Sequence, residues 1–301
     1  MSSLTIRTLL PLLVVSLSAC AVETAGPALD EEQVGSQEQP WTDGYGPARG
    51  HEDLTRFGID AANAKLASIT GTPAFFPTVA DGEACPSTTN PLLKGNCLTD
   101  FPDEEMAASY DSTTSDMAYD PELQDLHFLR NYVGSDGALG AREACEGALE
   151  RIQVATALGV SYWLQGDEAR AMRWFGHATH NVQDSFAPAH TQRSGSHLRV
   201  LDDVCVYRRT IPGVCTHPLI TTGDRIWKDS WSCWMNPFAR PFKCLKPEAQ
   251  EASTATAGYL RIVGTYLAQG AQGDVRANLQ SWFETVTSEG DSGYFRCNLL
   301  P

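Results

Sequence analysis

The chain has 301 residues, of which 42% are hydrophobic and 20% are charged. This is the composition of a globular protein, and the length is enough for one sizeable core. The formal net charge of -15 argues against a general binder of nucleic acids or anionic membranes. It does not exclude an enzyme that handles phosphates through bound cations, because such cations reverse the local field.

The first twenty residues, MSSLTIRTLLPLLVVSLSAC, contain one arginine, an apolar run and small residues at their end. This pattern is typical of an export signal, which is removed from the mature protein. The last four, Leu17-Ser18-Ala19-Cys20, resemble the lipobox of bacterial lipoproteins, in which the cysteine is acylated. The alternative is an ordinary signal peptide. We therefore expect an exported protein, either a lipoprotein of the bacterial cell envelope or a secreted one.

Residues 21–40, AVETAGPALDEEQVGSQEQP, are acidic and small and contain no aromatic side chain. They are expected to form a disordered spacer or propeptide. From Trp41 the composition changes, and residues 41–301 are expected to form one domain. Apolar residues at helical spacing predict a first helix over 51–68. Residues 70–125 are rich in Pro, Asp, Ser, Thr and Gly, which predicts long loops with at most short helices.

Four further helices are predicted, over residues 140–166, 167–187, 246–270 and 273–288. Asp167 can cap the second of these, and Pro188 should end or kink it. Residues 203–246 form another loop-rich block. No run is a convincing strand and no internal repeat is visible. The predicted fold class is therefore all-α, with a single helical bundle domain and long loops.

Nine cysteines are present, and setting Cys20 aside leaves eight, an even number suited to an oxidising compartment. We expect four disulfides that staple the loops. The spacing leaves the connectivity open, and none of it is the CxxC of a zinc knuckle or a redox pair. Short-range pairing would join Cys85 to Cys97, Cys205 to Cys215 and Cys233 to Cys244, which leaves Cys145 for Cys297.

Residues 177–190, HATHNVQDSFAPAH, contain three of the seven histidines of the chain. His180 and Asp184 are four residues apart and share one helical face, and His177 lies one turn earlier. His190 follows the proline and can return to the same site. An imidazole and a carboxylate one turn apart suit zinc, whose ligands lie about 2.0–2.2 Å away. The plainer interpretation is a solvated polar face of the helix.

The pattern His180-x3-Asp184-x5-His190, with a proline two residues before the last histidine, resembles the zinc-dependent phospholipase C family. The single-strand-specific zinc nucleases of fungi are relatives of that family. The family is an all-α bundle with three zinc ions in a cleft, so the resemblance implies a metal cleft here. Its last match is TAGYLRIVGTYL, which is similar to the closing helix of the bacterial phospholipases and ends at Leu267.

Three other segments resemble the family in the same order along the chain. Trp41 stands ten residues before His51, as the amino-terminal tryptophan of the family precedes a histidine that opens a helix. GNCLTDF places Asp100 where the family has a Gly-x4-Asp ligand. His127-Phe128 matches its His-Phe ligand segment.

The resemblance implies two or three zinc ions, with metal ligands at Trp41, His51, Asp100, His127, His180, Asp184, His190 and one of His197 and His217. Asp184 would bridge two ions, and His51 would share an ion with the amino group and carbonyl of an N-terminal Trp41. His190 would belong to the third ion, where the sequence departs from the family's His-x3-Glu or His-x3-Asp pair. His197 is followed by Leu201 and His217 by Thr221, so that Asp202 or Asp224 would have to supply the carboxylate. His177 falls on an apolar position of the family and is left out.

The lipobox and the resemblance differ on the mature amino terminus. The lipobox places it at an acylated Cys20, and the resemblance places it at Trp41. Both hold only if the spacer is cut after lipidation, and its disordered composition is one that proteases prefer.

A phosphodiester is anionic and resists attack by neutral water. Bound zinc ions lower the pKa of a bound water to about 7 and neutralise charge on the phosphoryl oxygens. The resemblance implies that Asp100 is catalytic and orients or deprotonates that water. We expect a monomeric phospholipase C that acts on phospholipid head groups. The alternatives are a single-strand nuclease, with Trp231 and Trp234 as base-stacking platforms, and a non-catalytic surface lipoprotein with a partial metal site.

Overall fold

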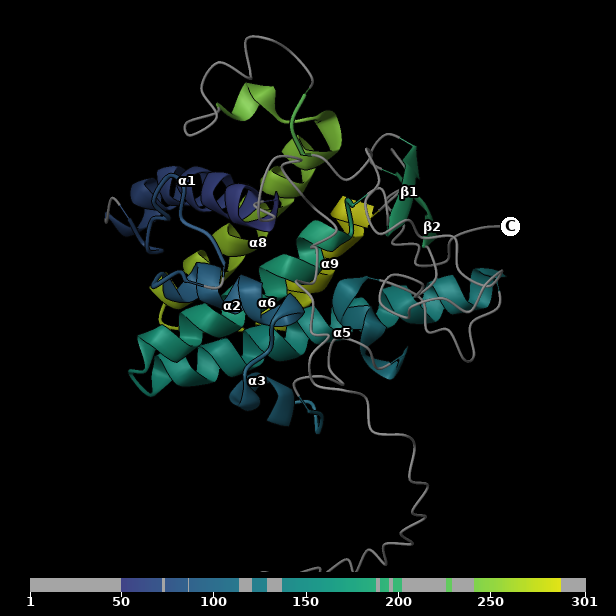
Figure 1. Ribbon diagram of the computed structural model, residues 1–301. Coiled ribbons are helices and arrows are strands. Elements are labelled where there is room, and N and C mark those ends of the chain that lie inside the picture. Colours follow the sequence, from purple (N-terminus) through teal and green to yellow (C-terminus); the bar gives the residue numbers. More distant parts are fainter. Residues whose placement is uncertain are drawn as a thin grey trace, which may run out of the picture. The chain divides into compact units, whose positions relative to one another are not determined.

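The computed structural model describes residues 50–71, 74–85, 87–113, 121–128, 137–187, 190–194, 197–201, 226–228 and 241–287. Its elements are α1 (Gly50–Thr70), α2 (Pro91–Asp100), α3 (Glu104–Ala108), the 3-10 helix η2 (Pro121–His127), α5 (Gly137–Leu164), α6 (Glu168–Asp184), the strands β1 (Thr191–Ser194) and β2 (His197–Leu201), the 3-10 helix η3 (Phe242–Cys244), α8 (Pro247–Ala268) and α9 (Val275–Thr287). The described part is predominantly helical (Figure 1), which confirms the predicted all-α class.

Helix α6 is the central element of this bundle. It packs against α2, α5 and α8, and α1 in turn packs along α8 (Figure 1). Every residue of α6 from Trp174 to Asp184 is buried. A helix surrounded in this way would normally be apolar on all faces, yet this one carries two histidines, an asparagine, a glutamine and an aspartate.

The helix boundaries follow from local capping groups. Asp167 accepts a hydrogen bond from the Arg170 N–H and caps α6, as predicted. Asn90 caps α2 by accepting from the N–H groups of the second and third helical residues, and Pro91 takes the first position. Helix α6 ends at Asp184, before Pro188, which lies outside the described residues.

The long loops predicted over residues 70–125, in which at most short helices were expected, include the ten-residue helix α2, which packs along α6 and buries Leu92 and Leu93. One part of the structure differs from the prediction. The expectation that the chain contains no strand was wrong, because β1 and β2 form an antiparallel hairpin. Their pairing register shifts between Gln192 and Arg193. Strands of four and five residues are too short for sequence periodicity to distinguish from a loop.

The predicted disulfide between Cys85 and Cys97 is confirmed. Cys145 and Cys244 are also disulfide-bonded, and the partners predicted for them, Cys297 and Cys233, lie outside the described residues. The predicted pair of residues 205 and 215 lies outside them as well.

The predicted signal peptide, the lipidation site Cys20 and the spacer all lie outside the described residues. Among the helices that the structure describes, none combines the length and apolar character needed to cross a membrane.

Two glycines allow the backbones of α2 and α6 to touch. A Cβ atom on Gly176 would lie 1.8 Å from the Leu92 carbonyl oxygen, and one on Gly95 would lie 1.8 Å from the Arg173 carbonyl oxygen. We expect Gly176→Ala to lower the free energy of unfolding by about 1–3 kcal/mol or more, because a rigid backbone atom stands where the methyl group must go.

Urea unfolding monitored by circular dichroism measures this effect. Ala61→Ser is the control, because it adds one atom to an exposed position of α1 and should change stability by less than about 0.5 kcal/mol. Equal stability of Gly176→Ala and the wild type would contradict the close contact between α2 and α6.

Candidate metal centre

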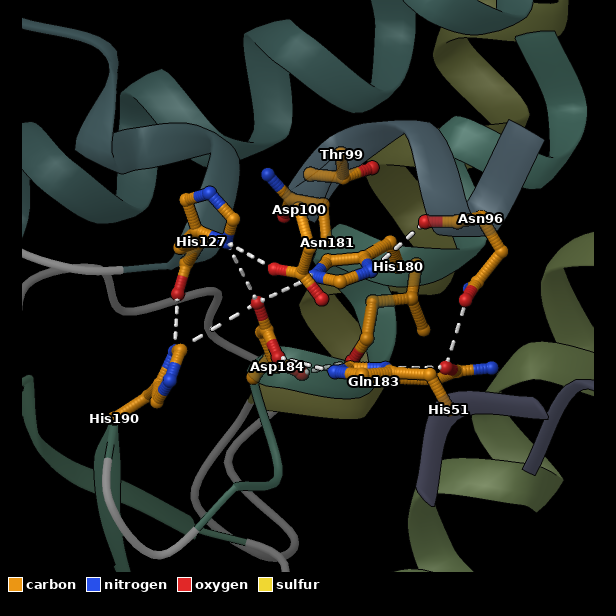
Figure 2. Close-up of polar contacts among 12 residues, drawn as sticks. His51, Asn96, Thr99, Asp100, His127, His180, Asn181, Gln183, Asp184 and His190 are labelled. Atoms are coloured by element: carbon orange, nitrogen blue, oxygen red, sulfur yellow. Dashed lines mark hydrogen bonds and ion pairs between the residues drawn. The ribbon is translucent and has the colours of Figure 1, made fainter. Parts of the chain in front are cut away.

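The ends of α2, η2 and α6, the start of α1 and the loop after α6 bring six of the predicted ligands together (Figure 2). All six side chains are buried, with at most 3% of their surface exposed, and they are His51, Asp100, His127, His180, Asp184 and His190. Residues up to 139 positions apart in the chain, His51 and His190, therefore meet at one site.

The two carboxylate oxygens of Asp184 face different histidines. Oδ1 lies 3.2 Å from His51 Nε2. Oδ2 lies 3.1 Å from His180 Nε2 and 3.3 Å from His127 Nδ1. The rings of His51 and His180 are stacked with their centroids 4.0 Å apart, and the Nε2 atom of each faces this carboxylate. Asp184 is placed as a bridging ligand would be.

Asp100 supplies the second carboxylate. Its Oδ1 lies 3.5 Å from His180 Nε2 and 3.7 Å from His127 Nδ1. Neither of its oxygens accepts a hydrogen bond from any residue that the structure describes. Asp100 and Asp184 are also the last residues of α2 and α6, where the helix dipole is negative. Two buried carboxylates at negative helix ends require positive charge between them.

The distances suit a metal ion. Two ligands held tetrahedrally at about 2.1 Å from one ion are separated by about 3.4 Å. Oxygen-to-nitrogen distances in the cluster range from 3.1 to 3.7 Å. Two groups have ligand atoms within 4.8 Å of one another, namely His51 with Asp100 and His180, and His127 with His180 and Asp184. These buried groups could hold a metal ion.

Hydrogen bonds from the Nδ1 atoms orient the rings of His180 and His190. His180 Nδ1 donates to the Asn96 carbonyl oxygen at 3.0 Å, and His190 Nδ1 donates to the His127 carbonyl oxygen. A carbonyl can only accept, so in the neutral ring the proton is on Nδ1 and Nε2 carries the lone pair. Histidines that bind metals are commonly oriented by such a bond from the other ring nitrogen.

The pKa values reflect the same need for positive charge. Burial alone would lower the pKa of His51, but the Asp184 and Asp100 carboxylates outweigh it and raise that pKa to about 9. The pKa of His127 is raised for the same reason. Burial alone would raise the pKa of Asp184, but the neighbouring His180, His190 and His51 hold it well below its usual range. Either protons on the histidines or a bound cation would neutralise the negative charge of these carboxylates.

The backbone beside His127 is in an uncommon conformation. Phe128, which follows it directly, is fully buried and has a φ of 56°, and a bulky residue in this region costs about 1–3 kcal/mol. Asn181 Nδ2 donates to the Asp125 carbonyl oxygen at 2.7 Å and ties this turn to α6. Such strain is found most often at functional sites.

His177, which was left out of the predicted ligands, is buried but engaged elsewhere. Its Nδ1 lies 2.7 Å from Thr99 Oγ1, and its Nε2 lies 2.7 Å from Tyr110 Oη. Burial, with smaller contributions from His180 and His127, lowers the pKa of His177 to about 3. A neutral ring with both nitrogens against hydroxyl groups is a structural histidine.

Two residues of the centre were not predicted from the sequence. Gln183 Oε1 lies 2.8 Å from His51 Nδ1, and Asn96 Nδ2 donates to the same oxygen at 3.2 Å. Each adjoins a predicted ligand in sequence or on the helix, but their contacts span 132 and 87 positions. Only the folded chain brings them together.

Apart from His197, the remaining predicted site residues are not placed. Those outside the described residues are Trp41, Asp202, His217, Asp224, Trp231 and Trp234. His197 begins β2, where its backbone pairs with Ser194. Compared with family models, curated proteins and solved structures, the chain has no match.

Proposed function

We propose that the protein is a zinc-dependent phosphodiester hydrolase, and that its substrate is a phospholipid, cleaved as by a phospholipase C. The observation that supports this best is the buried Asp184, whose two oxygens face His51 on one side and His127 and His180 on the other. Imidazole nitrogens with carboxylate oxygens are a donor set that zinc binds well. The pattern around His180 resembles the zinc-dependent phospholipases C.

We assign two zinc positions to the described cluster, on either side of the Asp184 carboxylate. His51 would belong to one position and His127 to the other; His180 is a member of both groups of ligand atoms, and Asp100 is a member of the group with His51. A third position would use His190 together with His197 or His217 and one of the carboxylates Asp202 and Asp224.

Bound zinc would supply a water with a pKa of about 7 and would neutralise the charge of the phosphoryl oxygens. Asp100 would then accept the proton of the water as its oxygen bonds to phosphorus. Both carboxylate oxygens of Asp100 lack a hydrogen bond from the described residues, so they can take a proton. The bond from phosphorus to the glycerol oxygen breaks, and that oxygen takes up a proton to give diacylglycerol and a phosphorylated head group.

We also propose that the protein is exported and anchored to the membrane of the cell envelope through an acylated Cys20. The signal-like first twenty residues support this proposal.

We expect Asp100→Asn to lower the rate of lecithin hydrolysis by about 10²–10⁴-fold, since an amide cannot accept the proton of the attacking water. Phosphorus NMR of the released head group measures the rate. Asp103→Asn is the matched control. Asp103 caps α3 and pairs with Arg173 on the surface, and asparagine caps helices equally well, so its rate should be that of the wild type.

The same preparation should be given single-stranded DNA. Hydrolysis of lecithin alone supports the phospholipase assignment, and hydrolysis of DNA alone replaces it by the nuclease. A zinc-loaded protein that cleaves neither substrate would make the chain a non-catalytic surface lipoprotein.

A further inference from the structure

Gln183 is a fully buried amide beside the metal centre, immediately before Asp184 on α6. Its Oε1 faces His51 Nδ1 at 2.8 Å and accepts from Asn96 Nδ2 at 3.2 Å. Its Nε2 donates to Thr55 Oγ1 at 2.9 Å and to Thr256 Oγ1 at 3.2 Å. These four contacts match the capacity of an amide, which has two acceptor lone pairs and two protons.

Two threonine hydroxyls determine which amide atoms of Asn96 and Gln183 are donors and which are acceptors (Figure 2 shows these two residues). Thr179 Oγ1 donates its only proton to the Gly176 carbonyl oxygen at 2.6 Å. It can therefore only accept from Asn96, which identifies the facing atom of Asn96 as its NH₂ nitrogen, 3.1 Å away. This NH₂ group also faces Gln183, so the Gln183 atom opposite it is the oxygen.

The other end of Gln183 leads to the same assignment independently. Thr256 Oγ1 donates its proton to the Ala252 carbonyl oxygen at 2.9 Å. It can only accept from Gln183, so the Gln183 atom facing Thr256 is the NH₂ nitrogen. Exchanging the amide oxygen and nitrogen of Gln183 would set two acceptors against each other at Thr256 and two donors at Asn96.

His51 Nδ1 thus faces an oxygen that can only accept, and this ring nitrogen must carry a proton. In a neutral imidazole the other nitrogen then holds the lone pair. That nitrogen, Nε2, points at Asp184 Oδ1, 3.2 Å away. A lone pair against a carboxylate oxygen is unfavourable unless a cation lies between them.

We propose that Gln183 is a positioning residue that holds the proton of His51 on Nδ1 and so presents Nε2 to a zinc ion. The inference rests on the proposed zinc centre. Without the Gln183 oxygen, the His51 proton would be drawn to Nε2 by Asp184, and a direct hydrogen bond would close the position that the ion needs.

The test compares the zinc affinity of full-length variants by competition with a chromophoric chelator. Gln183→Met keeps the length of the side chain and removes the acceptor, so we expect zinc affinity to fall by about 10–100-fold, as for other residues that orient a ligand. Gln183→Glu keeps an acceptor beside His51 but loses the donor toward Thr256, so it should retain more zinc affinity than Gln183→Met. The control is Asn63→Leu, which removes a different buried amide, one on α1 that is bonded to the Phe76 backbone away from the centre.

Thermal unfolding of the zinc-free variants separates positioning from folding. We expect Gln183→Met and Asn63→Leu to lose stability alike while only Gln183→Met loses zinc affinity. Equal zinc affinity of Gln183→Met and the wild type, or equal losses in both variants, would overturn the inference and leave the zinc centre standing. A wild type that binds no zinc would overturn both.

A second measurement needs no variant. In ¹⁵N-labelled wild type loaded with zinc, long-range nitrogen–proton correlation spectra should show the His51 ring proton on Nδ1 and zinc at Nε2. Zinc at Nδ1, or a proton on Nε2 of the loaded protein, would refute the role of Gln183 even if Gln183→Met does not fold.

Discussion

Replacing Asp184 by asparagine is expected to release zinc and to abolish hydrolysis. The carboxylate faces His51 through Oδ1 and His127 and His180 through Oδ2. Asparagine has nearly the same shape but no charge, and only one of its two terminal atoms can bind a metal ion. Residues that merely orient a ligand contribute about 10–100-fold to metal affinity, so loss of a shared ligand should exceed about 100-fold.

Chelator competition and elemental analysis of the Asp184→Asn protein measure this loss, and the lecithin assay measures the rate. The control is Asp60→Asn, at an exposed position of the same α1 helix that carries His51. It should keep the zinc content and the rate of the wild type. Full zinc occupancy in Asp184→Asn would show that this aspartate is not a bridging ligand.

The stability of the zinc-free protein and the added stability on zinc binding should change with pH in opposite directions. In the zinc-free protein the pKa of His51 is raised from 6.5 to about 9. A group whose pKa is raised on folding contributes stability below its unfolded pKa, and the contribution is lost as pH rises through the folded value. The pKa of Asp184 is lowered from 3.8, so its contribution is present above that value and is lost at lower pH.

The zinc-free protein should therefore be most stable between about pH 4 and 6.5 and should lose a few kcal/mol between about pH 6.5 and 9. Zinc binds imidazole only after the proton has left. The stabilisation by zinc should consequently grow over the same interval in which the zinc-free protein weakens.

Thermal unfolding with EDTA and with zinc, at a series of pH values from 5 to 9, tests both pH dependences. The His51→Gln variant is the control, because it lacks one of the two titrating rings and should reduce the alkaline loss of the zinc-free protein. Two unfolding curves that stay parallel over the whole range would contradict a metal-binding role for the buried histidines.

The helices could be predicted wherever a long segment of the sequence has apolar residues at helical spacing. The segments around α1, α5, α6, α8 and α9 have apolar residues at helical spacing, and each is a helix in the structure. The bounds of helix α2 were not predicted within residues 70–125, where at most short helices were expected between long loops; its ten residues include a glycine that packs on α6. Tertiary contact stabilises such a helix, and composition alone does not show that contact.

The candidate site was predictable in part. The pair His180 and Asp184 follows from helical geometry, because residues four apart share a face. His51, Asp100 and His127 come from three other elements, and only the resemblance to a known family connected them with that pair. Gln183 was not predicted, because its role depends on hydrogen bonds to α1, α2 and α8.

The most direct test is the metal content of the wild-type protein. Purified without chelator from a culture supplied with zinc, it should contain two or three zinc ions per chain by elemental analysis. The His180→Ala and Asp184→Ala variants should each contain at least one fewer. Wild-type protein that holds no transition metal after folding in the presence of zinc would contradict the metal centre and, with it, the proposed hydrolase.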